Sequence, residues 1–174
     1  MALGYACINM QLSYPQQYGG KEKGVQRITT GRSMIKRTFE SKGTDYASEI
    51  ILKNVRDLDK IIEWNIEHGY ELFRISSSMI PWKSEYKWSQ LKDLEEIKFW
   101  LKSGGEKATK GGLRLTTHPG QFNVLTSPHE HVVENCVTDL TIHGEVFDMM
   151  GLSRTPYNKI NIHVGGAYGD KPSA

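Results

Sequence analysis

Two histidines in this chain stand where a strand-like apolar run gives way to glycine, and this placement suggests a metal site. His118 closes a run that begins near residue 112, and His163 closes a run that begins near residue 159. The carboxyl ends of parallel strands meet at one edge of a sheet, so we expect both imidazoles to face a shared site. Imidazole suits zinc or manganese, and a hydrolytic site would need carboxylates as well.

A simpler reading of each histidine stays open. A histidine at a strand end is often an ordinary polar residue, because neutral imidazole needs only one donor and one acceptor. The glycines that follow both histidines allow a ligand to approach the backbone closely, which favours the metal reading. No acidic residue stands at the end of a strand-like run in the way that the two histidines do, so the carboxylate ligands are not identified.

The elements that must position these histidines alternate between strands and helices. Strand-like runs occur at about 3–9, 71–75, 112–117 and 159–164. Apolar residues at spacings of three and four predict helices at about 46–67 and 88–102, and a third helix that ends before Gly151. This alternation predicts an α/β fold with a parallel sheet and crossover helices.

The ends of the helices also carry signals. Gly69 is the expected stop of the first helix, and the stretch from Gly104 to Gly112 is expected to be a polar turn after the second. Ser127-Pro128-His129-Glu130 has the pattern of a capping box with proline at the first helical position, so the third helix should open there. His143 falls on the apolar stripe of that helix and is expected to be a core residue.

Four strand–helix steps make half of a (β/α)₈ barrel, which normally takes about 250 residues. We therefore expect residues 1–174 to form a single incomplete TIM-barrel domain that stops before its C-terminal half.

Composition excludes several classes of protein. The 174 residues are 38% hydrophobic, and no run approaches the roughly 18 to 20 apolar residues that a membrane span requires. There is no signal-peptide pattern, so we expect a cytoplasmic protein with no membrane partner, associated with the nucleoid in a bacterium or nuclear in a eukaryote. Cys7 and Cys136 fall in predicted strand and helix interiors, and we expect no disulfide.

The formal net charge of +2 says little about nucleic acid, but the distribution of charge says more. Between residues 11 and 43, seven basic residues stand against Glu22 and Glu40: Lys21, Lys23, Arg27, Arg32, Lys36, Arg37 and Lys42. Such a segment can neutralise phosphates, with Arg32 as a candidate contact, although most charge clusters are simply solvated loops.

Four segments, taken together and in this order, resemble the N-terminal part of the UV damage endonuclease family. They are Leu3-Gly4-Tyr5-Ala6-Cys7-Ile8-Asn9, Leu72-Phe73-Arg74-Ile75-Ser76, His118-Pro119-Gly120-Gln121 and His163-Val164-Gly165-Gly166-Ala167-Tyr168-Gly169. The combination is highly specific, whereas each segment alone would be weak. The resemblance implies a TIM barrel of the xylose-isomerase-like type, of which this chain holds about the first four βα units.

The resemblance also implies an activity and its cofactor. Family members are metal-dependent DNA repair endonucleases that flip a UV-damaged dinucleotide out of double-stranded DNA and cut the strand 5′ to the lesion. The resemblance implies divalent metal ions, with manganese expected and magnesium or zinc as alternatives. The remaining metal ligands, carboxylates among them, are expected beyond residue 174, so the catalytic residues are not identified and this chain alone should be inactive.

Site residues are carried over by position. His118 and His163 match two metal-binding histidines, and Tyr5 and Asn9 match positions beside the metals and the substrate. Gln121 and Phe122 match the pair that probes the duplex opposite the lesion. Phe122 departs from the usual tyrosine, but an aromatic face can fill a gap in the base stack without a hydroxyl.

A second departure concerns the metals. Ser76-Ser77-Ser78 stands where some members have a histidine, and serine cannot replace it as a strong ligand, which leaves the number of metals open. Arg74 and Lys171 are further candidates for phosphate contact, since guanidinium and ammonium groups both bind phosphate. An internal ion pair at the barrel mouth explains Arg74 equally well.

Two other functions remain open at this point. One is an apurinic-site nuclease or sugar isomerase of the same barrel superfamily, and the other is a non-catalytic fragment. Gln121-Phe122 directly after His-Pro-Gly favours a nuclease, because a stacking wedge has no purpose in a sugar isomerase.

Overall fold

The computed structural model describes residues 3–18 and 26–163, and its centre is a parallel sheet of four strands. The strands are β1 (Gly4–Ala6), β2 (Leu72–Ile75), β3 (Arg114–Thr117) and β4 (Lys159–Ile160). They lie side by side in sequence order, and every neighbouring pair is parallel. The predicted parallel sheet is confirmed, although each strand is shorter than its apolar run.

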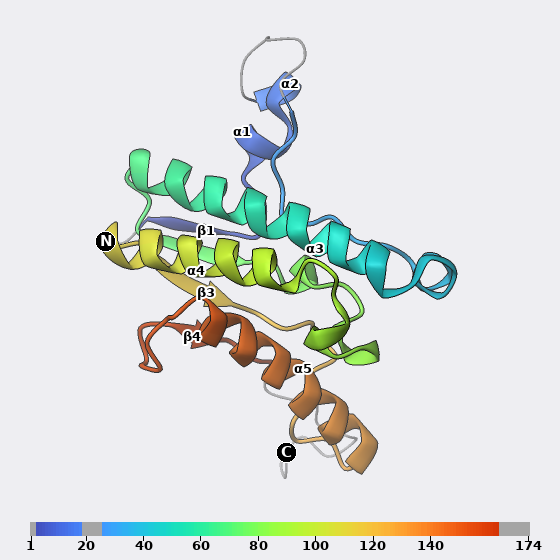
Figure 1. Ribbon diagram of the computed structural model, residues 1–174. Helices are drawn as coiled ribbons and strands as arrows, with labels where there is room; N and C mark the ends of the chain where they lie inside the picture. Colours follow the sequence, from blue (N-terminus) through green and yellow to red (C-terminus); the bar gives the residue numbers. More distant parts are fainter. Residues whose placement is uncertain (1–2, 19–25, 164–174) are drawn as a thin grey trace.

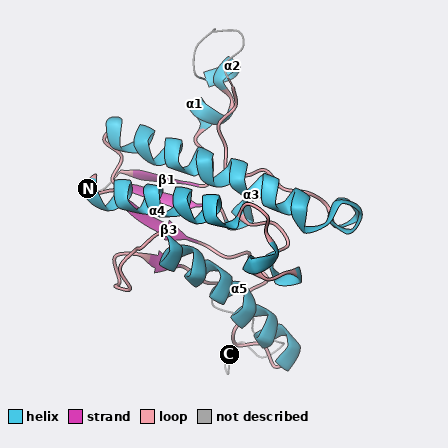
Figure 2. Ribbon diagram, in the orientation of Figure 1, coloured by secondary structure: helices cyan, strands magenta, loops and turns pink. Residues whose placement is uncertain are grey.

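Three long helices connect the strands. They are α3 (Lys36–Glu67), α4 (Leu94–Lys110) and α5 (Glu130–Met149), and together they cover one face of the sheet (Figure 1). The short helices α1 (Met10–Ser13) and α2 (Pro15–Tyr18) follow β1. Three 3₁₀ turns lie between β2 and α4: η1 (Ser77–Met79), η2 (Lys83–Glu85) and η3 (Trp88–Gln90). Figure 2 shows how short the strands are beside these helices.

The core lies between the sheet and the three helices. Phe73, Ile75 and Leu115 alternate along β2 and β3 toward the helices and are almost fully buried. Ile51 and Leu58 of α3 meet them from the other side. Because side chains alternate along a strand, Arg74 and Thr116 lie on the opposite face of the sheet.

The first helix contains the predicted one and extends it. The predicted range of 46–67 is the buried part of α3, whereas the turn before it is separated by Gly43, whose φ of 65° and ψ of −163° are not helical. The helix ends as expected, because Gly69 adopts a φ of 72° just after the last turn.

The second helix was predicted wrongly at both ends. It begins at Leu94 rather than near 88, because residues 88–90 form the separate turn η3. It also continues through Gly104 and Gly105, which were expected to lie in a turn. Both glycines are buried where α4 crosses the end of α5: a Cβ on Gly105 would lie 1.9 Å from the carbonyl oxygen of Met150.

The predicted capping box at the start of the third helix is also wrong. The Ser127 hydroxyl accepts a hydrogen bond from the His129 amide, two residues along, at 3.2 Å. This local turn delays the helix, which begins at Glu130 with His129 as a cap that makes no side-chain hydrogen bond. The serine therefore shapes the approach to α5 rather than capping it.

No helix in the described part of the chain is long and apolar enough to cross a membrane. Cys7 and Cys136 are both free thiols; Cys7 lies just after β1 with a φ of 62°, and Cys136 is buried in α5.

A candidate metal and nucleic-acid site at the strand ends

The structure brings His118 and His163 together at the carboxyl edge of the sheet. His118 follows the last residue of β3 directly, and His163 lies three residues after the end of β4. The two ring centroids are 4.5 Å apart, with the ring planes at 71°. The backbone amide of Asn161 donates to the carbonyl oxygen of Thr117 at 2.9 Å, which continues the strand pairing toward both histidines. The expectation that the two imidazoles lie together at the carboxyl ends of the parallel strands is therefore confirmed.

The half-buried ring of His118 is oriented by its own loop. Its Nδ1 atom lies 2.7 Å from the carbonyl oxygen of Pro119. A carbonyl oxygen only accepts, so Nδ1 must carry the proton in this contact, and the lone pair of Nε2 is free. Metal-binding histidines are commonly held in this way by a second hydrogen bond.

The two imidazoles fit part of a metal site but not all of it. Across residues 3–18 and 26–163, no group of three or more His, Cys, Asp or Glu side chains is placed to hold a metal ion. The donor set is therefore two nitrogen ligands, and a hydrolytic metal centre needs carboxylate oxygens in addition.

The loop after His118 turns the aromatic ring of Phe122 outward. The Phe122 side chain is 82% exposed, and Gln121 beside it is exposed as well. The next residue, Asn123, is only 8% exposed, and its backbone amide donates to the carbonyl oxygen of Gly120 at 3.0 Å. A tight turn therefore presents Gln121 and Phe122 to solvent in the loop that follows His118.

Helix α5 supports this edge of the sheet, and sequence reasoning missed two of the residues involved, Asn123 and Asp139. The Asn123 side-chain amide donates to the Asp139 carboxylate at 2.8 Å, and Nδ1 of His143 lies 3.2 Å from the Thr117 hydroxyl. His143 is a core residue, as predicted; burial lowers its pKa and the nearby Asp139 carboxylate partly offsets this. No spacing in the sequence marks Asn123 or Asp139, because their contact joins a loop to a distant helix face.

Tyr5 and Asn9 form a small cluster of their own at the end of β1. The Asn9 amide donates to the Tyr5 hydroxyl at 2.7 Å, and the Tyr5 ring packs against Tyr70 and Phe73 on the helix-covered side. Burial raises the pKa of the Tyr5 hydroxyl. Strand β2 lies between β1 and β3, so the strands that precede this cluster and His118 are not neighbours in the sheet.

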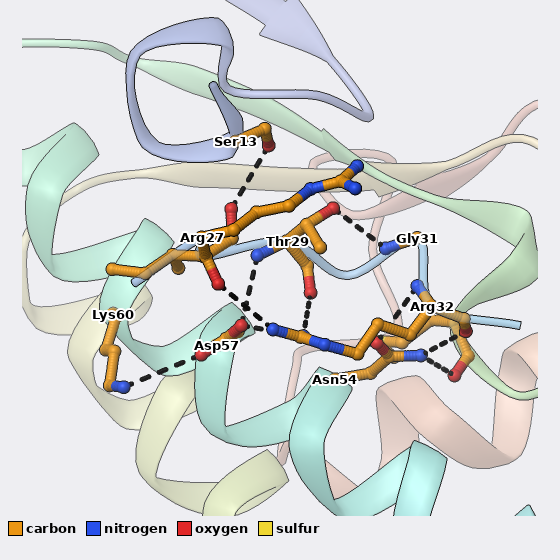
Figure 3. Close-up of polar contacts among 10 residues, drawn as sticks. Ser13, Arg27, Thr29, Gly31, Arg32, Asn54, Asp57 and Lys60 are labelled. Atoms are coloured by element: carbon orange, nitrogen blue, oxygen red, sulfur yellow. Dashed lines mark hydrogen bonds and ion pairs between the residues drawn. The ribbon is translucent and has the colours of Figure 1, made fainter. Parts of the chain in front are cut away.

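Arg32 is partly buried and is held against α3. Its guanidinium forms an ion pair with the buried Asp57 carboxylate of α3 at 2.7 Å and donates to the carbonyl oxygen of Thr29 at 2.6 Å (Figure 3). Asn54 donates to the Arg32 carbonyl oxygen from the same helix at 2.8 Å. These contacts favour a structural role for Arg32, which fastens the segment to α3, over the expected phosphate contact.

Arg74 lies on the sheet face that the helices leave uncovered. In the register of the sheet it is level with Thr116 and Lys159, so a second cation stands two strands away on the same face. Its Nε atom is buried and has no hydrogen-bond partner among the described residues. Lys171, the other candidate for phosphate contact, lies outside the described residues.

Comparison with known proteins identifies the family. The family described as UV-endonuclease UvdE matches residues 1–174. A putative UV-damage endonuclease of Acanthamoeba polyphaga mimivirus is 39% identical over 97% of this chain, which corresponds to 48% of that relative. The UV-damage endonuclease of Schizosaccharomyces pombe is 33% identical over 97% of this chain and 27% of its own length.

A solved structure agrees with the sequence relatives. The crystal structure of SacUVDE superimposes with a TM-score of 0.77 and 28% sequence identity, covering 96% of this chain and 50% of that one. The chain thus spans half or less of the length of these relatives. Its four-stranded parallel sheet corresponds to the first units of a TIM-barrel-like fold, which confirms the predicted fold class. The chain belongs to the UV-endonuclease UvdE family.

Proposed function

We propose that this chain supplies the N-terminal half of a metal-dependent DNA repair endonuclease that flips UV-damaged dinucleotides and cuts the strand 5′ to the lesion. One observation carries the proposal: the paired imidazoles of His118 and His163 lie beside a loop that exposes the aromatic ring of Phe122. Family membership gives the reaction class, and this geometry supplies groups suited to a metal and to a base stack.

His118 and His163 would hold a divalent cation, for which we propose manganese. The Nε2 lone pair of His118 is available because Nδ1 is engaged by Pro119. A divalent cation bound there would offset the negative charge that develops on the phosphate during hydrolysis. The carboxylate ligands would come from the region of the relatives that this chain does not span, so we propose that the chain alone does not cut DNA.

Phe122 and Gln121 would read the lesion. Flipping two bases leaves a gap in the duplex, and an exposed aromatic face can fill it by stacking, while Gln121 offers hydrogen bonds to the opposite bases. The substrate would be double-stranded DNA with UV lesions, so the protein would work where the DNA is, in the nucleoid or the nucleus. An exposed wedge beside the histidines fits this function better than a sugar isomerase.

The experiment is an incision assay on a chimera in which residues 1–174 are joined to the remaining part of a full-length relative. The substrate is an end-labelled duplex with a single thymine dimer, and an undamaged duplex serves as the control. We expect one cut 5′ to the dimer that requires Mn²⁺ and is lost in His118→Ala and His163→Ala. Equal cutting of both duplexes, or cutting that survives EDTA, would contradict the proposal.

A further inference from the structure

The loop after His118 is fastened to α5 at one residue. Asn123 is 8% exposed, whereas its neighbour Phe122 is 82% exposed. Burial of Asn123 against α5 holds the turn in a form that leaves the ring of Phe122 exposed. The direction of the ring therefore depends on what holds Asn123.

Two contacts hold the Asn123 side chain. Its Nδ2 donates to the carbonyl oxygen of Gly120 at 3.1 Å, within the loop, and to Oδ2 of Asp139 at 2.8 Å, across to α5. The second bond has a carboxylate acceptor, and hydrogen bonds to charged groups are stronger than neutral ones. Nδ2 carries two protons, so one amide closes the turn and anchors it at the same time.

Asp139 is itself in a defined setting. The Nε2 atom of His143, one helical turn further along α5, lies 3.9 Å from the same carboxylate oxygen. His143 contacts the Thr117 hydroxyl at 3.2 Å, so α5 supports both ends of the segment from Thr117 to Asn123. The thiol of Cys136 approaches the carbonyl oxygen of Phe122 at 3.9 Å, a weak third contact.

We propose that Asn123 and Asp139 are positioning residues, a loop clamp that holds Gln121 and Phe122 in the orientation needed to probe the duplex. This inference rests on the proposed function and deepens it, because it makes the lesion preference depend on two residues outside the pair proposed to probe the duplex. Without the clamp, the apolar ring of Phe122 would be free to fold onto the protein surface. Binding to DNA would then have to order the ring, and this entropy cost would weaken the affinity.

The test measures the preference of the chimera described under the proposed function for a duplex with one thymine dimer over the undamaged duplex, by fluorescence anisotropy. We expect Asn123→Ala and Asp139→Ala each to reduce this preference about tenfold, with the affinity for undamaged DNA changed less than twofold. Asp139→Asn keeps an acceptor oxygen and should retain most of the preference. Glu134→Ala removes an exposed acid from the same helix and should change nothing, so it is the matched control.

The double variant gives a sharper criterion. If one contact is responsible, Asn123→Ala with Asp139→Ala should be no worse than either substitution alone, because both remove the same interaction. Additive losses, a full lesion preference in Asn123→Ala, or equal losses on damaged and undamaged duplex would overturn the loop clamp.

Hydrogen exchange separates this proposal from the proposed function. If the unsubstituted chimera shows no lesion preference, the lesion-reading role of the loop fails, yet the loop clamp is still tested by the exchange rate of the Asn123 backbone amide, which donates to the Gly120 carbonyl oxygen. This rate should rise about tenfold in Asn123→Ala and Asp139→Ala but not in Glu134→Ala, while the rest of the chain is unchanged. Unchanged exchange in both clamp variants would overturn the clamp by itself.

Discussion

At the scale of single residues, the loop after β3 divides its tasks among neighbours. His118 is half-buried, and its Nδ1 is engaged by Pro119, so only one ring nitrogen is available outward. Phe122 projects into solvent, and Asn123 is buried against α5. The proposed metal ligand, the proposed stacking ring and the anchor thus lie within six consecutive residues, and His118 and Asn123 are oriented by different partners.

Substitutions of Phe122 test the stacking role. An aromatic ring that replaces two flipped bases recovers about 1–3 kcal/mol by stacking. We therefore expect Phe122→Ala to weaken binding to lesion-containing duplex by about tenfold or more, in a chimera completed with the rest of a relative. Phe122→Tyr keeps the ring and should be nearly neutral, and Gln121→Ala should cost less because it removes hydrogen bonds but not the stack.

Undamaged duplex provides the control for these substitutions. It is bound mainly through phosphates, so its affinity should respond to salt and hardly at all to changes at Phe122. A tenfold loss on both duplexes in Phe122→Ala would make the residue a general packing element and remove the lesion-reading role.

At the scale of elements, α4 packs closely against the end of α5. Gly105 contacts the backbone of Met150, and Gly104 lies next to Ile62 of α3. Two glycines in a helix lower its stability relative to alanine, so the close packing of the helices must contribute enough free energy to offset this loss. The crossing fixes the end of α5, the helix whose other residues support the candidate site.

A pair of glycine substitutions tests this crossing. In Gly105→Ala the new Cβ would meet the Met150 carbonyl oxygen at 1.9 Å, and backbone cannot yield as a flexible side chain can. We expect a loss of about 2 kcal/mol or more of unfolding free energy, or at least about 4 °C in Tm. Gly144→Ala in α5 meets nothing within 4 Å and should stabilise by up to about 1 kcal/mol.

Thermal melts of the two variants measure this difference directly. The account of the crossing would be wrong if Gly105→Ala melted at or above the wild-type temperature, or if both variants shifted in the same direction.

The elements also show which features the sequence could predict. The apolar stripe of α3 and the alternation of strands and helices follow regular patterns of apolar residues, so both can be predicted from the sequence alone. Gly104-Gly105 was interpreted as a turn because paired glycines usually mark one, and nothing in the sequence reveals that another helix approaches there. Ser127 has the right spacing for a cap, but its hydroxyl is used by the nearer amide of His129.

The candidate site divides in the same way. His118 and His163 were predicted to meet because a parallel sheet gathers its strand ends at one edge whatever the details of packing. The contact between Asn123 and Asp139 depends on how the loop packs against α5, and the spacing of residues in the sequence does not predict it. Arg32 was grouped with the basic segment, whereas its ion pair with Asp57 depends on the path of the chain along α3.

At the scale of the whole molecule, the described part of the chain is an open sheet rather than a closed barrel. Strands β1 and β4 each have a single partner strand among the described residues. Leu3, Ile8 and Ile162 lie near these outer strands and are largely exposed. The face opposite the helices carries Arg74 and Lys159, which a completed barrel would enclose.

We therefore expect the isolated 174-residue chain to self-associate. Unpaired strand edges and exposed apolar side chains favour pairing with another chain, whereas barrel closure removes the edges. Sedimentation velocity at micromolar concentration should show dimers or larger species. A stable monomer under these conditions would count against the open-sheet interpretation.

The most direct test of the account is metal binding, because its central claim is that β3 and β4 bring two imidazoles into one metal site. A Mn²⁺ titration followed by electron paramagnetic resonance compares the wild-type chain with His118→Ala and His163→Ala. His129→Ala with His131→Ala is the control, since it removes two exposed histidines elsewhere. We predict weak, saturable binding that persists in the control and is lost in each site variant. Tight binding that survives both His118→Ala and His163→Ala would contradict the account.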